Sequence, residues 1–169
     1  MIPLGIDAAP TGQLRQLADD LFWARFELPF RLNHINLYML DTSDGWVLID
    51  TGLNNQATAA HWQMLLSGPL AGKPVVQIIV THHHVDHIGY AGPLAELTGA
   101  DVFASTAEAE HARWLYDLGP DEFGGLLAQT YARYGLPAET IEAVRQGGSR
   151  YRRNTAPLTD FISLSAGAE

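Results

Sequence analysis

A buried strand that runs directly into a cluster of metal-ligand side chains constrains this chain most. Residues 75–80 read Val-Val-Gln-Ile-Ile-Val, a short and largely β-branched apolar run typical of a buried strand. Thr-His-His-His-Val-Asp-His follows at 81–87, and two glycines then lead into a helix-like segment at 93–97. The cluster therefore lies at the carboxyl end of a strand, where α/β sheets place their ligand sites.

The spacing inside the cluster fits two metal ions. Side chains alternate along an extended chain, so His82 and His84 project to one side and can reach one ion, whereas His83 projects to the other. Asp86 and His87 are neighbours that converge where the chain turns, and there they would serve a second ion. Two-metal hydrolytic sites hold their ions about 3.5–4 Å apart. Imidazole and carboxylate ligands without thiolate suit zinc, with iron or manganese as alternatives.

Three motifs resemble the metallo-β-lactamase superfamily. Thr-His-x-His-x-Asp-His at 81–87 is similar to the metal-binding signature of that superfamily. Trp-Val-Leu-Ile-Asp-Thr-Gly at 46–52 resembles the strand and turn upstream of the signature, and residues 36–40 resemble the hairpin strand before it. The resemblance spans residues 28–104. It implies an α/β fold, the first half of a metallo-β-lactamase-like αββα sandwich.

The resemblance also implies a role for individual residues. His82 and His84 would bind the first metal ion, and Asp86 and His87 the second, so two zinc ions are expected in the full protein. Asp86 would also hold or shuttle a proton between steps. Asp50 would accept a hydrogen bond from a ligand histidine and fix its orientation; a turn-forming role is the alternative for this residue.

The implied activity is hydrolysis of a small ester, a thioester like hydroxyacylglutathione, or a lactone. A zinc-bound water has its pKa lowered from about 15.7 to about 7, which yields hydroxide at neutral pH. The net charge of −9 disfavours a polyanionic nucleic acid. The basic cluster at 150–153 and Arg145 forms either a solvated turn or an anion-binding lip. A phosphodiesterase or nuclease of the same superfamily and a non-catalytic metal-binding relative stay open as alternatives.

The resemblance requires three further ligands: a histidine for the first ion, a bridging aspartate and a last histidine. After the motif the sequence has one histidine, His111. Ser105 and Glu108 predict a capping box that opens a helix, so we expect His111 in that helix and not at the metals. We therefore expect residues 1–169 to be the amino-terminal part of one domain whose carboxyl-terminal part is missing, and to be inactive alone.

Periodicity predicts the remaining elements. Strands are expected at 22–30, 35–40, 46–49, 75–80 and 102–104, with an Asp-Gly hairpin turn at 42–45. Residues 14–21 are expected to form a short helical or irregular start. Helices are expected at 55–66, 93–97, 107–118, 121–134 and 138–146, the last three in a helical insertion near 106–146. A stripe in the middle helix is assigned to the core, with a lid over the site as the alternative: Phe123, Leu126, Leu127, Thr130, Tyr131 and Tyr134.

Composition sets the class of protein and its partners. The 169 residues, 47% hydrophobic and 17% charged, are typical of one globular domain. The chain has no cysteine, which excludes disulfides and thiolate metal sites. An apolar stretch of membrane-spanning length and a secretion signal are both missing from the sequence, so the cytoplasm is expected. We expect a small-molecule substrate, no nucleic acid and no membrane partner, and a homo-oligomer stays open.

Overall fold

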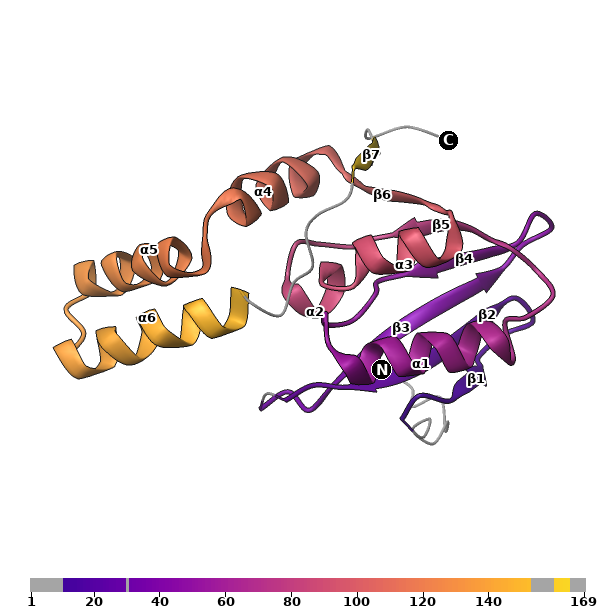
Figure 1. Cartoon of the computed structure of the whole chain (residues 1–169), viewed down its shortest axis with the longest axis horizontal. Helices are drawn as coiled ribbons and strands as arrows, with labels where there is room; N and C mark the ends of the chain where they lie inside the picture. Colours follow the sequence, from indigo (N-terminus) through magenta and orange to yellow (C-terminus); the bar gives the residue numbers. More distant parts are fainter. Residues whose placement is uncertain (1–10, 30, 153–159, 165–169) are drawn as a thin grey trace.

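One mixed sheet of seven strands forms the frame of the protein in the computed structural model (Figure 1). The structure describes residues 11–29, 31–152 and 160–164. The strands follow each other across the sheet in chain order. They are β1 (Leu14–Gln16), β2 (Leu21–Glu27), β3 (His34–Asp41), β4 (Trp46–Ile49), β5 (Val75–Ile79), β6 (Asp101–Ser105) and β7 (Phe161–Leu164).

The sheet changes from antiparallel to parallel at β4. Strands β1 to β4 pair antiparallel, and β4 to β7 pair parallel. The predicted hairpin turn at 42–45 joins β3 to β4, and the Thr42 hydroxyl closes it by donating to the carbonyl of Gly45 at 2.7 Å. Parallel neighbours need a crossover connection, and helices supply it from β4 onward.

Six helices lie in the described part of the chain. They are α1 (Gln56–Ser67), α2 (Val85–Ile88), α3 (Ala91–Thr98), α4 (Thr106–Asp117), α5 (Pro120–Arg133) and α6 (Ala138–Arg152). Helix α1 begins where the Asn55 side chain accepts a hydrogen bond from the Thr58 amide at 2.8 Å. Helices α5 and α6 lie side by side, away from the sheet (Figure 1). Gly148 allows this approach, because a Cβ there would lie 2.7 Å from Leu127 Cδ1.

The two faces of the sheet differ in how well they are covered. Helices α1 and α3 lie across one face (Figure 1) and bury one row of side chains: Met39, Leu48, Ile78, Val102 and Phe161. The neighbouring row points to the other face and is only partly covered: Tyr38, Ile49, Ile79, Phe103 and Ile162. Because these residues are apolar, that face offers a surface for further packing.

The core lies between the covered face and α1. Trp62 of α1 is fully buried, and its ring meets Phe26 of β2 edge-on at a centroid distance of 5.4 Å. The Trp62 indole N–H donates to the Thr51 carbonyl at 2.8 Å, which satisfies a polar group inside the core. This bond also holds α1 against the loop that follows β4, the loop that carries Asp50.

The α/β fold class predicted from the sequence is confirmed, and three local predictions are wrong. Residues 150–152 of the basic cluster form the end of α6, not a turn. Residues 14–16 form β1, not a helical or irregular start, because they pair with β2. Tyr131 and Tyr134 were assigned to the core but are 41% and 78% exposed, since α5 packs mainly against α6 and not on the sheet. That residues 106–146 form an insertion within a single domain of 1–169 stays a prediction. Within the described residues, none of the helices is both long and apolar enough to cross a membrane.

Candidate metal centre

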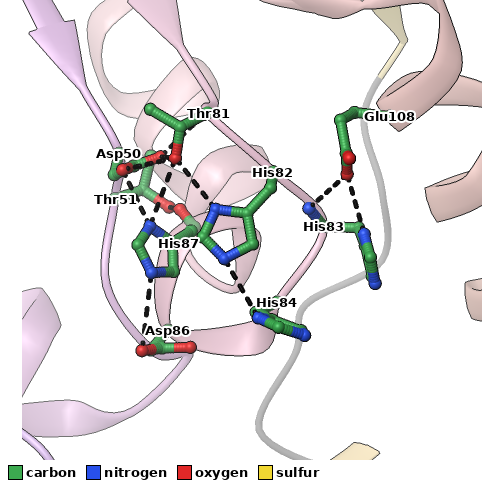
Figure 2. Close-up of polar contacts among 9 residues, drawn as sticks. All are labelled: Asp50, Thr51, Thr81, His82, His83, His84, Asp86, His87 and Glu108. Atoms are coloured by element: carbon green, nitrogen blue, oxygen red, sulfur yellow. Dashed lines mark hydrogen bonds and ion pairs between the residues drawn. The ribbon is translucent and has the colours of Figure 1, made fainter.

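The loop after β4 aims a carboxylate at the end of β5. The Asp50 amide donates to the Ile79 carbonyl at 2.8 Å, which extends the pairing of β4 with β5 by one step. Asp50 then takes a left-handed conformation with φ of 63°. Aspartate tolerates this region better than most residues. The side chain is 5% exposed and points toward the histidine motif (Figure 2).

Three donors satisfy the Asp50 carboxylate. The Thr81 amide donates to Oδ1 at 2.8 Å, and the Thr81 hydroxyl donates to Oδ2 at 2.8 Å. His87 Nδ1 lies 2.8 Å from Oδ2 and must be the donor, because a carboxylate only accepts (Figure 2). A neutral His87 therefore keeps its lone pair on Nε2, which lies 3.6 Å from Asp86 Oδ2.

The same logic fixes the tautomer of His82. The Thr81 hydroxyl donates its proton to Asp50. It therefore accepts the hydrogen bond from His82 Nδ1, which lies 3.0 Å away. The lone pair of a neutral His82 is then on Nε2. That nitrogen faces His84 Nδ1 at 3.0 Å. One buried carboxylate thus orients two histidines, His87 directly and His82 through Thr81.

Helix α2 supplies the turn that brings the second pair of side chains together. His84 is its N-cap, and the His87 amide donates back to the His84 carbonyl at 2.9 Å. The amide and hydroxyl of Thr51 donate to the His87 carbonyl at 2.9 and 2.7 Å. Asp86 and His87 therefore lie on one turn, clamped to the loop that carries Asp50. The rings of His82 and His87 have centroids 3.9 Å apart.

Burial favours the neutral form of His82 and His84. It lowers the pKa of His82, and the neighbouring charges of His87 and His84 lower it further. Burial also lowers the pKa of His84, with the charge of His83 as the next cause. Metal ions bind the neutral imidazole, so the environment favours the ligand form of both rings.

His83 is held by α4, and its ring lies 4.9 Å from the ring of His84. Glu108 Oε2 accepts from the His83 amide at 2.9 Å and from His83 Nδ1 at 2.7 Å (Figure 2). The Tyr116 hydroxyl donates to the His83 carbonyl at 2.7 Å. The His111 ring lies 4.3 Å from the His83 ring. His111 is thus a residue of α4 beside His83.

The predicted capping box of α4 is only half formed, so that prediction is wrong in part. Ser105 Oγ accepts from the Glu108 amide at 3.2 Å, as an N-cap should. The Glu108 carboxylate binds His83 instead of returning to the cap. The hydrogen bond from His83 is the main reason why the pKa of Glu108 is lowered. The sequence carried one signal for this contact: a histidine on the side opposite the candidate ligands needs its own partner.

The donor set suits a hard or borderline metal but forms incomplete groups. His82 Nε2 and His84 Nδ1 face each other, and Asp86 Oδ2 lies 3.6 Å from His87 Nε2. Within the described residues, His, Asp and Glu side chains form no group of three or more positioned to hold one metal ion. Imidazole and carboxylate side chains fit zinc in chemistry, and here they lie in two pairs.

Comparisons with known proteins point to one family. The model of the metallo-beta-lactamase superfamily matches residues 31–157 of the chain. The chain is 31% identical over 100 residues to the "Probable metallo-hydrolase YybB" of Bacillus subtilis (strain 168), an overlap of 58% of this chain and 43% of that protein. It is 36% identical over 64 residues to the hydroxyacylglutathione hydrolase of Ectopseudomonas mendocina (strain ymp). That match covers 38% of this chain and 24% of that protein.

A solved structure agrees with these sequence relatives. The beta-lactamase domain protein from Burkholderia ambifaria superposes with a TM-score of 0.72 at 27% identity. The superposition covers 95% of this chain and 45% of that chain. The chain thus spans less than half the length of each of these three proteins.

Proposed function

Because the chain belongs to the metallo-β-lactamase superfamily, we propose that it carries part of the metal centre of a hydrolase for small esters, thioesters or lactones. One observation supports this most: Asp50 orients His87 directly and His82 through Thr81, so that the lone pair of each neutral ring lies on Nε2, the nitrogen that would bind a metal. Such carboxylate support behind a ligand histidine is typical of metal sites. A solvated polar loop would have no need of it.

The four motif side chains divide between two ions in this proposal. His82 and His84 would hold the first ion through the nitrogens that face each other, and Asp86 and His87 would hold the second. Bound zinc would supply a Lewis acid and hydroxide at neutral pH. Asp86, whose Oδ2 lies 3.6 Å from His87 Nε2, would also hold or shuttle a proton between steps. Thr81 and Asp50 keep the rings in the required tautomers throughout.

Two observations bear on the substrate. The chain has a net charge of −9, which repels a polyanion and so favours a small molecule over nucleic acid. A relative of 36% identity over 64 residues is a hydroxyacylglutathione hydrolase, which acts on a thioester. We therefore place small thioesters first, with simple esters and lactones next.

The test is hydrolysis by the intact protein loaded with zinc. Thioesters, p-nitrophenyl esters and lactones would be assayed beside metal analysis after dialysis. We expect turnover, close to two equivalents of metal, and loss of both on His84→Ala or Asp86→Ala in variants that keep the wild-type circular dichroism spectrum. Unchanged metal content in both variants would refute the metal centre. Two bound ions without turnover on any of these substrates, or on a phosphodiester, would favour a non-catalytic relative.

A further inference from the structure

A pocket adjoins the histidine motif on the side of His83. It has a volume of about 550 Å³ and lies between the motif and the helices α4, α5 and α6. This is within the range of roughly 300–1,000 Å³ found for small-molecule sites. His83, His84 and His111 form its polar end, and further residues of α4, α5 and α6 form the remaining wall.

The walls of the pocket are mainly apolar. Phe123, Leu126 and Leu127 of α5 and Leu115 of α4 line it. The two hydroxyls in the lining donate to backbone carbonyls, that of Tyr116 to His83 at 2.7 Å and that of Thr130 to Leu126 at 2.9 Å. These hydroxyl protons are therefore not offered to a ligand. The lining thus suits an apolar group better than a polar one.

The pocket and the candidate metal centre share a residue. His84 lines the pocket, and its Nδ1 lies 3.0 Å from His82 Nε2. A group in the pocket would therefore be continuous with a reacting centre held at the motif. This also explains the stripe on α5 that the sequence assigned to the core: Phe123, Leu126, Leu127 and Thr130 face the pocket, while Tyr131 and Tyr134 are exposed.

We propose that this pocket binds the apolar chain of the substrate, an alkyl or aryl group next to the scissile carbonyl. The inference rests on the proposed hydrolase function and adds to it the substrate class: esters or thioesters with an apolar chain, not those with short polar groups. The His83–Glu108 contact fixes the boundary between pocket and motif, because it ties the motif to α4.

Two glycines provide a matched pair of variants. Gly147 of α6 lines the pocket, and a Cβ built there meets nothing within 4 Å, so Gly147→Leu would place a side chain in open space. A Cβ at Gly125 of α5 also meets nothing within 4 Å, but this residue is not part of the lining. Gly125→Leu therefore makes the same change to a helix without filling the pocket.

The first measurement is independent of catalysis. Binding of octanoate and of acetate to the metal-free intact protein would be followed by titration calorimetry. We expect octanoate to bind more tightly than acetate, and Gly147→Leu to weaken octanoate binding about tenfold or more, since pocket contacts of this size discriminate by roughly 10–200-fold. Gly125→Leu should leave octanoate binding within about twofold of the wild type.

The second measurement uses the zinc-loaded protein. Values of kcat/KM would be compared in two series. The first series has octanoyl and acetyl thioesters of one thiol, and the second has acetyl thioesters of a long and a short thiol. The comparison tells whether the acyl group or the leaving thiol enters the pocket. We expect one series to favour the long chain, and Gly147→Leu to lower the long-to-short ratio of that series about tenfold.

The outcomes separate this inference from the proposed function. Hydrolysis without chain-length preference, or equal effects of the two leucine variants, would overturn the pocket assignment and leave the hydrolase standing. Octanoate binding that Gly147→Leu weakens, with no hydrolysis of any substrate, would overturn the hydrolase and leave an apolar ligand site. Equal binding of octanoate and acetate to the wild type would also overturn the pocket assignment.

Discussion

At the scale of single residues, Asp50 meets two demands that few side chains satisfy together. Its backbone has a φ of 63°, and its carboxylate accepts hydrogen bonds from both Thr81 and His87. Asparagine tolerates the same backbone region. Its amide would donate to His87 Nδ1, however, and the proton of a neutral His87 would then move to Nε2, where it blocks the metal.

We therefore expect Asp50→Asn to lower activity of the zinc-loaded protein about 10–100-fold, the usual range for loss of a partner behind a ligand. Thermal unfolding should change little. Asp50→Ala should lower activity more than it lowers metal occupancy. Asp41→Asn is the control, because Asp41 is a sheet residue whose exposed ion pair with Lys73 lies outside the motif. Wild-type activity in Asp50→Asn would rule out the role given to this carboxylate.

The lowered pKa values of His82 and His84 predict how stability depends on pH. Burial is the first cause of both shifts. The unfolded chain therefore takes up protons on these rings at a higher pH than the folded chain does. Stability should be flat at neutral pH and fall as pH drops below about 6.5, the pKa of a free histidine.

Urea unfolding of the metal-free protein between pH 7.5 and 5 would measure this dependence. His84→Gln should reduce the slope because one of the two rings no longer titrates. Glu108 acts in a lower window: its lowered pKa contributes stability that is lost only below about 4.3, the value for a free glutamate. A slope that His84→Gln leaves unchanged would assign the pH dependence to other groups.

At the scale of elements, the contact between α4 and the motif loop predicts a coupling energy. Glu108 accepts two hydrogen bonds from His83, and its side chain is 31% exposed. Solvent screening reduces the strength of such bonds, so we expect Glu108→Ala to cost about 1 kcal/mol of stability. Glu110→Ala, an exposed change on the same helix, should stay within about 0.5 kcal/mol.

Part of the Glu108→Ala effect would come from the first turn of α4 itself. A double-mutant cycle with His83→Ala, followed by urea unfolding, isolates the contact. A coupling energy near zero would mean that the two side chains do not stabilise each other.

Most elements were predictable from local sequence because the relevant signals are local. Alternation predicted β3, the Asp-Gly turn before residue 46 predicted where β4 begins, and the cap at Ser105 predicted where α4 begins. Strand β1 was missed because three residues carry too little alternation, and its pairing with β2 decides its conformation. Periodicity gave the apolar stripe of α5 but not which neighbour it would face.

The candidate site was predictable only where sequence neighbours make it. Alternation predicted that His82 and His84 share a side; in the structure His82 Nε2 faces His84 Nδ1, while His83 is bound to Glu108 although its ring lies 4.9 Å from that of His84. The contacts of Asp50 with His87 and of Glu108 with His83 join residues 37 and 25 positions apart. No local pattern encodes such contacts. The first came from the family resemblance, and the second was not foreseen.

At the scale of the whole molecule, one face of the sheet is only partly covered, and the candidate ligands in the described residues form no group of three. The row of side chains on this face is apolar. Tyr38 at one end of the row is 36% exposed, and Ile162 at the other end is 46% exposed. The candidate ligands lie in two pairs, whereas catalytic zinc usually has three protein ligands plus water. What packs against this face of the sheet therefore determines both how far the face is buried and how many ligands the candidate metal site has.

A polypeptide of residues 1–169 alone should therefore bind zinc weakly and fail to hydrolyse thioesters. Titration calorimetry with zinc and a thioesterase assay at saturating zinc would measure both, beside the intact protein. A His82→Ala/His84→Ala variant is the control: it should lose the weak zinc binding that remains, because we propose these two rings as ligands of the first ion. Robust turnover by residues 1–169 would mean that the side chains of this chain complete the metal site by themselves, against the two-ligand count for each ion.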